Sequence, residues 1–178
     1  HLGDWGTPFG MLIEHLLDLG EASAAHGIAD LDAFYKAARA KFDASEAFAD
    51  RARARVVLLQ GGDEATLALW RMLVEESKRS FRAVYDRLGI TMKDSDAAGE
   101  SFFNDRLAPT IAELKDKGLV VESEGALCVF PPGFTGREGA PLPLIVKKKD
   151  GGAGYATTDL AAIRYRAVEL GATRLVYV

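Results

Sequence analysis

The residues best suited to recognising a charged ligand are Tyr155 and Asp159, in the stretch GYATTDLAAIRYR. If a helix begins near Tyr155, side chains four positions apart lie on one face, roughly 6 Å from each other. The helix dipole favours an ionised carboxylate at this end. A fixed carboxylate suits a planar guanidinium, which binds it through two parallel hydrogen bonds. The phenol beside it can accept a hydrogen bond or stack on the cation. The pair therefore predicts a site for a flat, positively charged group.

A structural role explains the same residues equally well. Thr157 or Thr158 can cap the helix, while Asp159 only complements the helix dipole and Tyr155 packs in the core. Acidic residues are common in first helical turns. Residue types alone leave both interpretations open.

A glycine-rich turn, residues 150–154 (DGGAG), and three lysines precede this pair. The glycine spacing fits neither GxGxxG nor GxxxxGK[ST], so a turn that needs positive φ angles is favoured over a phosphate cradle. The lysines Lys147, Lys148 and Lys149 can meet the phosphates of ATP or RNA. They are equally typical of the solvated end of a strand.

The opening stretch HLGDWGTPFG is a second candidate site, because three glycines and a proline predict a loop around Asp4 and Trp5. Glycines allow the backbone to approach a flat or charged ligand closely. Asp4 and Trp5 are therefore candidates for the wall of a ligand pocket. The alternative is that Trp5 is a core residue in a tight turn.

The composition excludes several classes of protein. A net charge of −4 argues against nucleic-acid binding through bulk charge. One cysteine and three widely separated histidines form no disulfide and predict no metal site. This cysteine usage suits a reducing cytoplasm. No run of 18 apolar residues is present, so no membrane contact is expected.

Helical periodicity dominates the first half of the chain. Apolar residues recur at helical spacing from Phe9 to Leu17, and Gly20 is placed to end that helix. Further helices are predicted after Asp30 or Asp32, over residues 45–59, and over residues 63–88 before Gly89. The last of these carries one apolar side formed by Leu67, Trp70, Leu73, Val74, Phe81, Val84, Tyr85 and Leu88.

The second half mixes helix and strand. Residues 101–117 predict a helix that bends or restarts near Pro109, and residues 119–130 predict a β-hairpin. Residues 142–178 predict a strand, a helix from about Thr158 to Leu170, and a second parallel strand at residues 175–178. A helical block before a βαβ unit indicates an α/β fold with an insertion.

Two stretches resemble arginyl-tRNA synthetase, a class I aminoacyl-tRNA synthetase: residues 1–16 (HLGDWGTPFGMLIEHL) and residues 150–166 (DGGAGYATTDLAAIRYR). The resemblance covers essentially the whole chain. In that family the first stretch follows the ATP-binding HIGH motif and usually carries glutamine where this chain has Pro8. The second contains a Tyr-x-x-x-Asp pair that binds the substrate arginine. The resemblance therefore assigns arginine binding to Tyr155 and Asp159.

The resemblance implies a partial Rossmann-type catalytic domain with a mainly helical insertion and a small β-hairpin. Residues 1–20 would end the first half of the nucleotide-binding fold, residues 21–141 would form the insertion, and residues 142–178 would begin the second half. The complete enzyme would activate L-arginine with ATP and Mg²⁺ and transfer it to tRNA(Arg) in the cytoplasm. No cofactor is expected to bind tightly to this chain.

The sequence contains neither a HIGH-like motif nor a KMSK-like lysine loop, so no residue is assigned a catalytic role. The chain starts with histidine inside a glycine-rich loop, which indicates an excised fragment. By itself, it is expected to be inactive. Two other functions remain open: a non-catalytic module that binds RNA or a protein partner, and a degenerate synthetase relative that binds arginine without charging tRNA.

Overall fold

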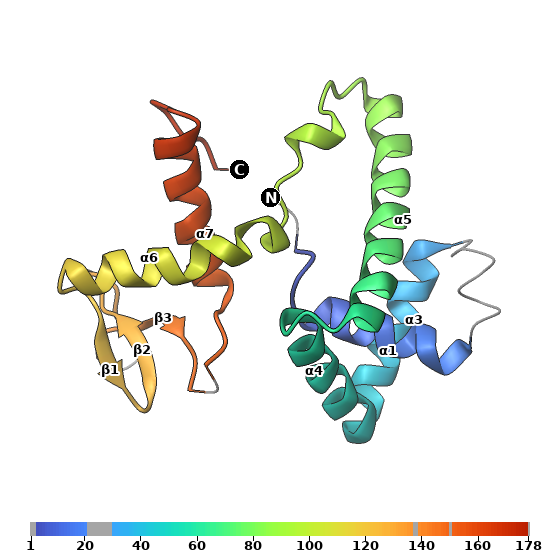
Figure 1. Cartoon of the computed structure of the whole chain (residues 1–178), viewed down its shortest axis with the longest axis horizontal. Coiled ribbons are helices and arrows are strands. Elements are labelled where there is room, and N and C mark those ends of the chain that lie inside the picture. Colours follow the sequence, from blue (N-terminus) through green and yellow to red (C-terminus); the bar gives the residue numbers. More distant parts are fainter. Residues whose placement is uncertain (1–2, 21–29, 137–138, 150, 178) are drawn as a thin grey trace. The chain divides into compact units, whose positions relative to one another are not determined.

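The computed structural model describes residues 3–20, 30–136, 139–149 and 151–177 (Figure 1). The chain divides into two compact units, His1–Gly99 and Glu100–Val178. In their described parts, the first unit is built from helices, and the second contains a small sheet with helices.

Three helices of the first unit, α3, α4 and α5, begin where the sequence supplies a capping side chain. Its main helices are α1 (Thr7–Leu19), α3 (Leu31–Ala44), α4 (Glu46–Gln60) and α5 (Glu64–Leu88), followed by the short turn η1 (Asp94–Asp96). Asp30, not Asp32, caps α3, where its Oδ1 accepts a hydrogen bond from the backbone N–H of Ala33 at 2.9 Å. Asp63 caps α5 in the same way. These caps confirm the predicted helix starts.

The core of the first unit forms around α1. Its buried apolar side chains pack with residues of the other three helices; the cluster comprises Phe9, Met11, Leu12, Ile13, Leu16, Phe34, Ala38, Phe48, Ala52, Leu59 and Leu73. Gly10 lets α1 and α4 approach closely, because a Cβ atom there would lie 2.2 Å from the carbonyl oxygen of Ala52. Any larger residue at this position would push the two helices apart.

Only part of the predicted apolar side of α5 is buried. Leu73 is buried, and Leu67, Trp70 and Val74 pack partly buried against the core. The residues nearer the C-terminus of α5 do not continue this packing: Phe81, Val84 and Leu88 are exposed. Figure 1 shows this half of α5 extending past α1, α3 and α4. The apolar stripe is therefore longer than the helical core that it contacts.

His15 is a polar residue enclosed within this core. The residue is 5% exposed, its ring centroid lies 4.8 Å from that of Phe34, and its buried Nδ1 has no hydrogen-bond partner among the described residues. Burial lowers the pKa of His15 below its ordinary value of 6.5, and the nearby Lys41 lowers it further, while Asp18 opposes the shift. The imidazole is therefore held in its neutral form.

The stability of the first unit is expected to fall as the pH drops below 6.5, the ordinary pKa of the histidine. The unfolded chain takes up a proton at His15 more readily than the folded chain, so acid favours unfolding. The contribution is fully present above pH 6.5. The test is urea unfolding at several pH values between about 5.5 and 7.5, a range in which free histidine titrates and free carboxylates do not.

The control for this test is His15→Leu, whose stability is expected to change less over the same pH range. An equal pH dependence in both proteins would contradict the prediction. The other two histidines, His1 and His26, lie outside the described residues, and they are present in both proteins. The difference between the two curves therefore isolates His15.

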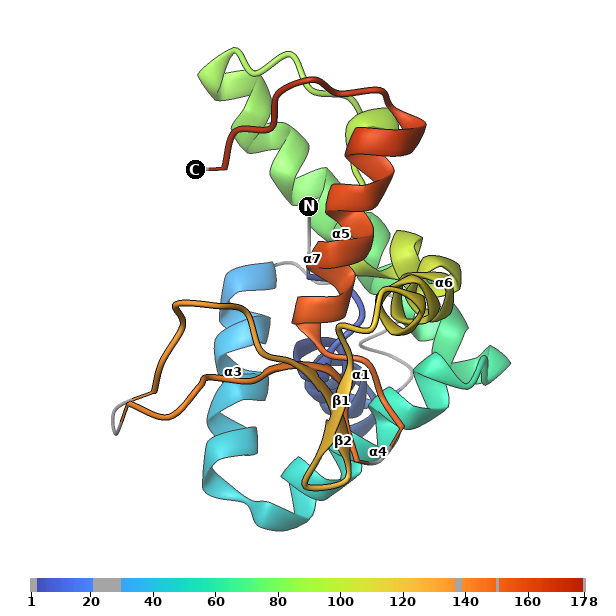
Figure 2. The same cartoon turned by 90° about the vertical axis from the view of Figure 1, so that its left-hand side faces the viewer.

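The second unit holds a three-stranded sheet and the helices α6 (Asn104–Asp116) and α7 (Tyr155–Arg164), with the short turns η2 (Glu100–Phe103) and η3 (Tyr165–Glu169). Figure 2 shows α6 nearly end-on beside α7, with which it packs. Pro109 lies inside α6, which runs through it without a new start. The missing N–H of a proline removes one helical hydrogen bond, and here this loss does not end the helix.

The strands β1 (Val121–Ser123), β2 (Ala126–Val129) and β3 (Leu144–Lys147) pair in that order, and both pairs are antiparallel. Glu124 and Gly125 have positive φ angles of 52° and 80°. Two such central residues are typical of a type I′ turn, which suits a two-residue hairpin. The hairpin predicted at residues 119–130 is therefore confirmed.

The predicted parallel strand at the end of the chain is absent from the described residues. Residues 171–177 form no strand, and Val178 lies outside the described part. The strand β3 pairs with β2 of the hairpin, and no described segment offers residues 171–177 a partner. A parallel strand forms only beside another strand that pairs with its backbone N–H and C=O groups, so an apolar run alone does not determine one.

The helix α7 begins at Tyr155, earlier than the predicted Thr158.

The two compact units do not coincide with the predicted division of the chain. Their boundary follows Gly99, inside the predicted insertion of residues 21–141. Compactness does not define the halves of a nucleotide-binding fold, so the division into residues 1–20, 21–141 and 142–178 stays a prediction.

None of the described helices is both long and apolar enough to cross a membrane.

Candidate functional site

The start of α7 is held by its neighbouring strand and not by a capping side chain. Gly154 occupies the N-cap position with extended backbone and no side-chain cap. The hydroxyl of Thr157 instead donates a hydrogen bond of 2.5 Å to the carbonyl oxygen of Val146 in β3. Thr158 bonds to the Gly154 carbonyl oxygen, at 3.4 Å. The interpretation in which one of these threonines caps the helix is therefore wrong.

Tyr155 and Asp159 lie one turn apart on α7, as their spacing predicts. The buried residues of this helix are Thr157, Thr158, Ala161 and Ala162. Tyr155 is 78% exposed, so it does not pack in the core of this unit. Asp159 is also exposed. The phenol and the carboxylate are thus both accessible on one helix face, where residues at i and i+4 are neighbours.

The described residues do not enclose this pair in a pocket. Neither side chain is buried, so the surrounding protein does not strengthen the charge of Asp159 by excluding water. The geometry supplies a carboxylate and an aromatic ring near the N-terminal end of a helix. This geometry by itself does not select arginine over another cation.

The glycine-rich segment before α7 forms a tight turn. The backbone N–H of Lys148 donates to the carbonyl oxygen of Gly152 at 2.8 Å, and Gly151 has a φ angle of 87°. This conformation favours the interpretation as a turn that requires glycine. Asp150 lies outside the described residues, and Lys147, Lys148 and Lys149 are exposed. Their exposure fits the solvated end of a strand.

Asp4 and Trp5 lie in the first unit, where Trp5 packs against a helix of that unit. The rings of Trp5 and Trp70 meet edge to face at 5.2 Å, and the Trp70 Nε1–H donates to the carbonyl oxygen of Asp4 at 2.6 Å. The Asp4 carboxylate lies against Gly99, where an added Cβ would come within 2.4 Å of Oδ2. Trp5 therefore has the packing role considered from the sequence, and its role as a pocket wall stays a prediction.

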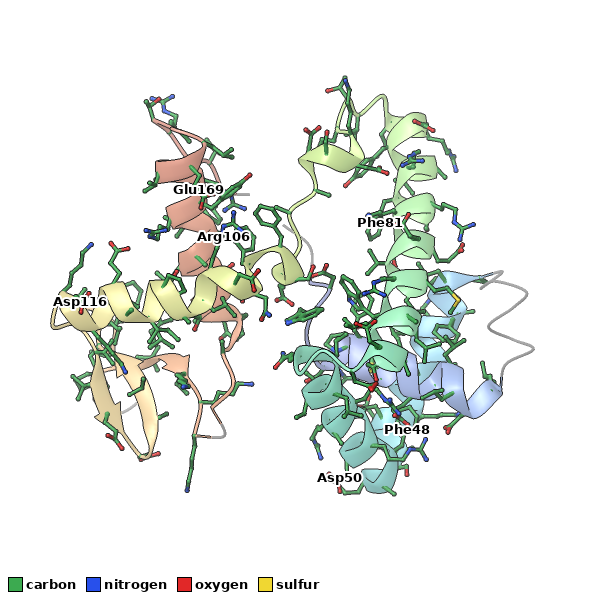
Figure 3. The ribbon with its side chains drawn as sticks, in the orientation of Figure 1. Phe48, Asp50, Phe81, Arg106, Asp116 and Glu169 are labelled. Atoms are coloured by element: carbon green, nitrogen blue, oxygen red, sulfur yellow. The ribbon has the colours of Figure 1, made fainter. Side chains whose placement is uncertain are left out.

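The second unit contains an ion pair, Arg106–Glu169, that the sequence did not predict. Arg106 donates to Glu169 through Nε at 3.2 Å and through Nη2 at 3.0 Å (Figure 3). Its guanidinium also lies 4.4 Å from the ring centroid of Phe102 and 5.3 Å from that of Tyr165. The hydrogen bonds from Arg106 lower the pKa of Glu169. This pair ties the π-helical turn η3, after α7, to α6. The two residues are 63 positions apart, so no local pattern could have indicated it.

Across residues 3–20, 30–136, 139–149 and 151–177, no group of three or more histidine, cysteine, aspartate or glutamate side chains is arranged to hold a metal ion.

Solved structures and family comparison identify the class of protein that contains this fold. The structure superimposes on the arginyl-tRNA synthetase of Plasmodium falciparum with a TM-score of 0.74 and 29% identity, over 96% of this chain and 27% of that chain. The family model for the catalytic domain of tRNA synthetases class I (R) matches residues 1–178. The fold is thus that of a class I synthetase catalytic domain.

Curated relatives agree with this assignment. The chain is 62% identical over 180 residues to the arginine–tRNA ligase of Thermobifida fusca and 53% identical over 186 residues to that of Frankia casuarinae. Both alignments cover 100% of this chain, but it spans only 31% and 32% of these relatives. The chain belongs to the family of class I (R) tRNA synthetase catalytic domains.

Proposed function

We propose that this chain is the part of an arginine–tRNA ligase that holds the side chain of L-arginine. The observation that carries the proposal is the similarity of the whole chain to arginine–tRNA ligases, at up to 62% identity. The position of Tyr155 and Asp159 on one accessible face of α7 supports it. No observation favours an RNA- or partner-binding module or a degenerate synthetase over this function.

In the proposed reaction, Asp159 binds the guanidinium and Tyr155 stacks on it or accepts a hydrogen bond from it. This anchoring fixes the far end of the amino acid, so its own carboxylate can attack the α-phosphate of ATP and pyrophosphate can leave. Such chemistry depends on positioning and on stabilisation of charge, and needs no protein nucleophile. A hydroxyl of the terminal ribose of tRNA(Arg) then attacks the carbonyl carbon of the arginyl-adenylate, and AMP leaves.

Other residues have less direct roles in the proposal. Residues 1–20 would end the first half of the nucleotide-binding fold, where Asp4 and Trp5 would border the pocket, and residues 142–178 would begin its second half. ATP and Mg²⁺ are substrates of the complete enzyme, and no residue of this chain is assigned to the metal. Cys128, a free and buried thiol, agrees with a reducing compartment, so we place the reaction in the cytoplasm.

The 178-residue chain by itself is expected not to exchange ATP with pyrophosphate in the presence of arginine and tRNA(Arg). It carries neither a HIGH-like motif nor a KMSK-like loop and spans about 31% of its relative. The measurement is ATP–pyrophosphate exchange with the purified chain. Turnover well above that of a protein-free blank would contradict this prediction.

The positive test is a chimera in which this chain replaces the matching residues of the Thermobifida fusca ligase. We expect the chimera to charge tRNA(Arg) with arginine and not with lysine. The unaltered ligase is the positive control. A folded chimera that binds arginine without charging tRNA would indicate a degenerate relative. A folded chimera that does not bind arginine would refute the proposed function.

A further inference from the structure

We infer that Thr157 is a positioning residue, which sets the start of α7 so that Tyr155 and Asp159 present their side chains to arginine. The inference rests on the proposed function, because it concerns the same arginine site. Thr157 is buried while Tyr155 and Asp159 are exposed, so we expect no contact between Thr157 and the substrate. Its effect would pass through the rotation and position of the first turn of α7.

The geometry of the threonine shows how it connects the two elements. Thr157 and Val146 are both fully buried, at 0% exposure, and are joined by the hydrogen bond of 2.5 Å between hydroxyl and carbonyl. Val146 lies in β3, and Thr157 lies in the first turn of α7. A buried carbonyl that lost this donor would be left without compensation for its desolvation, so the bond resists displacement of the helix.

The connecting loop is rich in glycine, and a backbone hydrogen bond from Lys148 to Gly152 closes its turn. The loop between β3 and α7 contains Gly151, Gly152 and Gly154, which have the widest backbone freedom of any residue type. Gly154 is the N-cap residue and offers no side-chain cap. The hydroxyl of Thr157 therefore supplies a fixed point that a capping side chain supplies in other helices.

The neighbouring threonine provides an internal contrast. Thr158 is also buried, at 7% exposure, but its hydroxyl bonds within the same element, to the carbonyl oxygen of Gly154 at 3.4 Å. A bond from a side chain to the residue four positions earlier does not link the helix to the sheet. Thr157 and Thr158 thus share residue type and burial, and they differ in what their hydroxyls hold together.

The test compares Thr157→Ala with Thr157→Ser in the chimera described above. Both variants lack the threonine methyl group, and only the serine variant keeps a hydroxyl. We expect Thr157→Ala to raise the KM for arginine by about tenfold to a hundredfold, as misplacement of a binding group by about 1 Å does. The KM for ATP should change little, and Thr157→Ser should restore arginine binding to near that of the unsubstituted chimera.

The matched control is Thr158→Ala, which is expected to leave the KM for arginine unchanged. Thermal unfolding of each variant separates loss of position from loss of fold. If Thr157→Ala does not fold, Thr157→Val makes the same comparison, because valine keeps the volume and lacks only the hydroxyl. A folded Thr157→Ala or Thr157→Val variant with normal arginine KM would overturn the inference, as would a Thr157→Ser variant that is as impaired as Thr157→Ala.

Failure of this inference can be told from failure of the proposed function. If the Asp159→Asn variant no longer binds arginine while the Thr157 variants bind it normally, the assignment of the arginine site is supported and the positioning role of Thr157 is refuted. If the unsubstituted chimera does not recognise arginine, the proposed function fails first.

Discussion

Asp159→Asn in the chimera is expected to lower kcat/KM for arginine by about two to four orders of magnitude. In the chimera with arginine bound, we expect the pair of Asp159 and the guanidinium to be desolvated. Removing one partner of such a pair costs about 3–5 kcal/mol, and each 1.36 kcal/mol corresponds to about a tenfold change. Asparagine keeps the shape of the side chain and removes its charge, so the loss would report the guanidinium–carboxylate pair. The measurement is arginine-dependent ATP–pyrophosphate exchange in the presence of tRNA(Arg).

The control for Asp159→Asn is Asp105→Asn, which removes an exposed carboxylate from the first turn of α6. Asp105 lies in the first turn of its helix, whereas Asp159 lies beyond the first turn of α7. Only the change at Asp159 should alter the use of arginine. If the two variants had equal effects, the carboxylate of Asp159 would have no specific role in arginine binding.

Glu14→Gln is expected to lower the free energy of unfolding of the first unit by about 1–3 kcal/mol, since it removes a buried carboxylate that accepts charge-assisted hydrogen bonds from two arginines. The Glu14 side chain is 8% exposed and accepts hydrogen bonds from Arg51 Nε at 3.0 Å and Arg55 Nε at 2.7 Å. Arg55 also donates to Thr66 at 2.9 Å. Glu14 thereby joins α1 to α4, and Arg55 extends the network to α5.

Urea unfolding followed by tryptophan fluorescence measures this change selectively. The chain has two tryptophans, Trp5 and Trp70, and both belong to the unit His1–Gly99. The control is Glu46→Gln, at an exposed carboxylate that pairs with Arg53 on the surface of α4. A surface pair contributes about 0–1 kcal/mol, so equal losses in the two variants would contradict the role assigned to Glu14.

The local structure was predictable where a short pattern decides it. Asp30, Ser45 and Asp63 cap helices because their side chains reach a backbone N–H three residues later. Gly89 ends α5 because it adopts a left-handed conformation, with a φ angle of 67°. The hairpin followed from two apolar runs around residues 122–125. In each case, the determinant lies within a few residues of its effect.

The parallel strand and the environment of the candidate site were not predictable in this way. The run Leu175–Val178 has strand composition, but a strand forms only where another strand satisfies its backbone. The spacing of Tyr155 and Asp159 placed them on one face, and it gave no information about their burial. The bond from Thr157 to Val146 joins residues 11 positions apart in different elements. A threonine in a first turn therefore suggested a cap, and the structure assigns it another partner.

The position of Cys128 gives the second unit a chemical probe of its own. This lone cysteine is 2% exposed and lies in β2, the central strand of the sheet. A thiol reagent reaches a buried sulfur only when the surrounding structure opens. The labelling rate of Cys128 therefore measures how often the sheet opens, without any engineered tag. Such a readout would follow the half of the chain that carries Tyr155 and Asp159, which has no tryptophan to report on it.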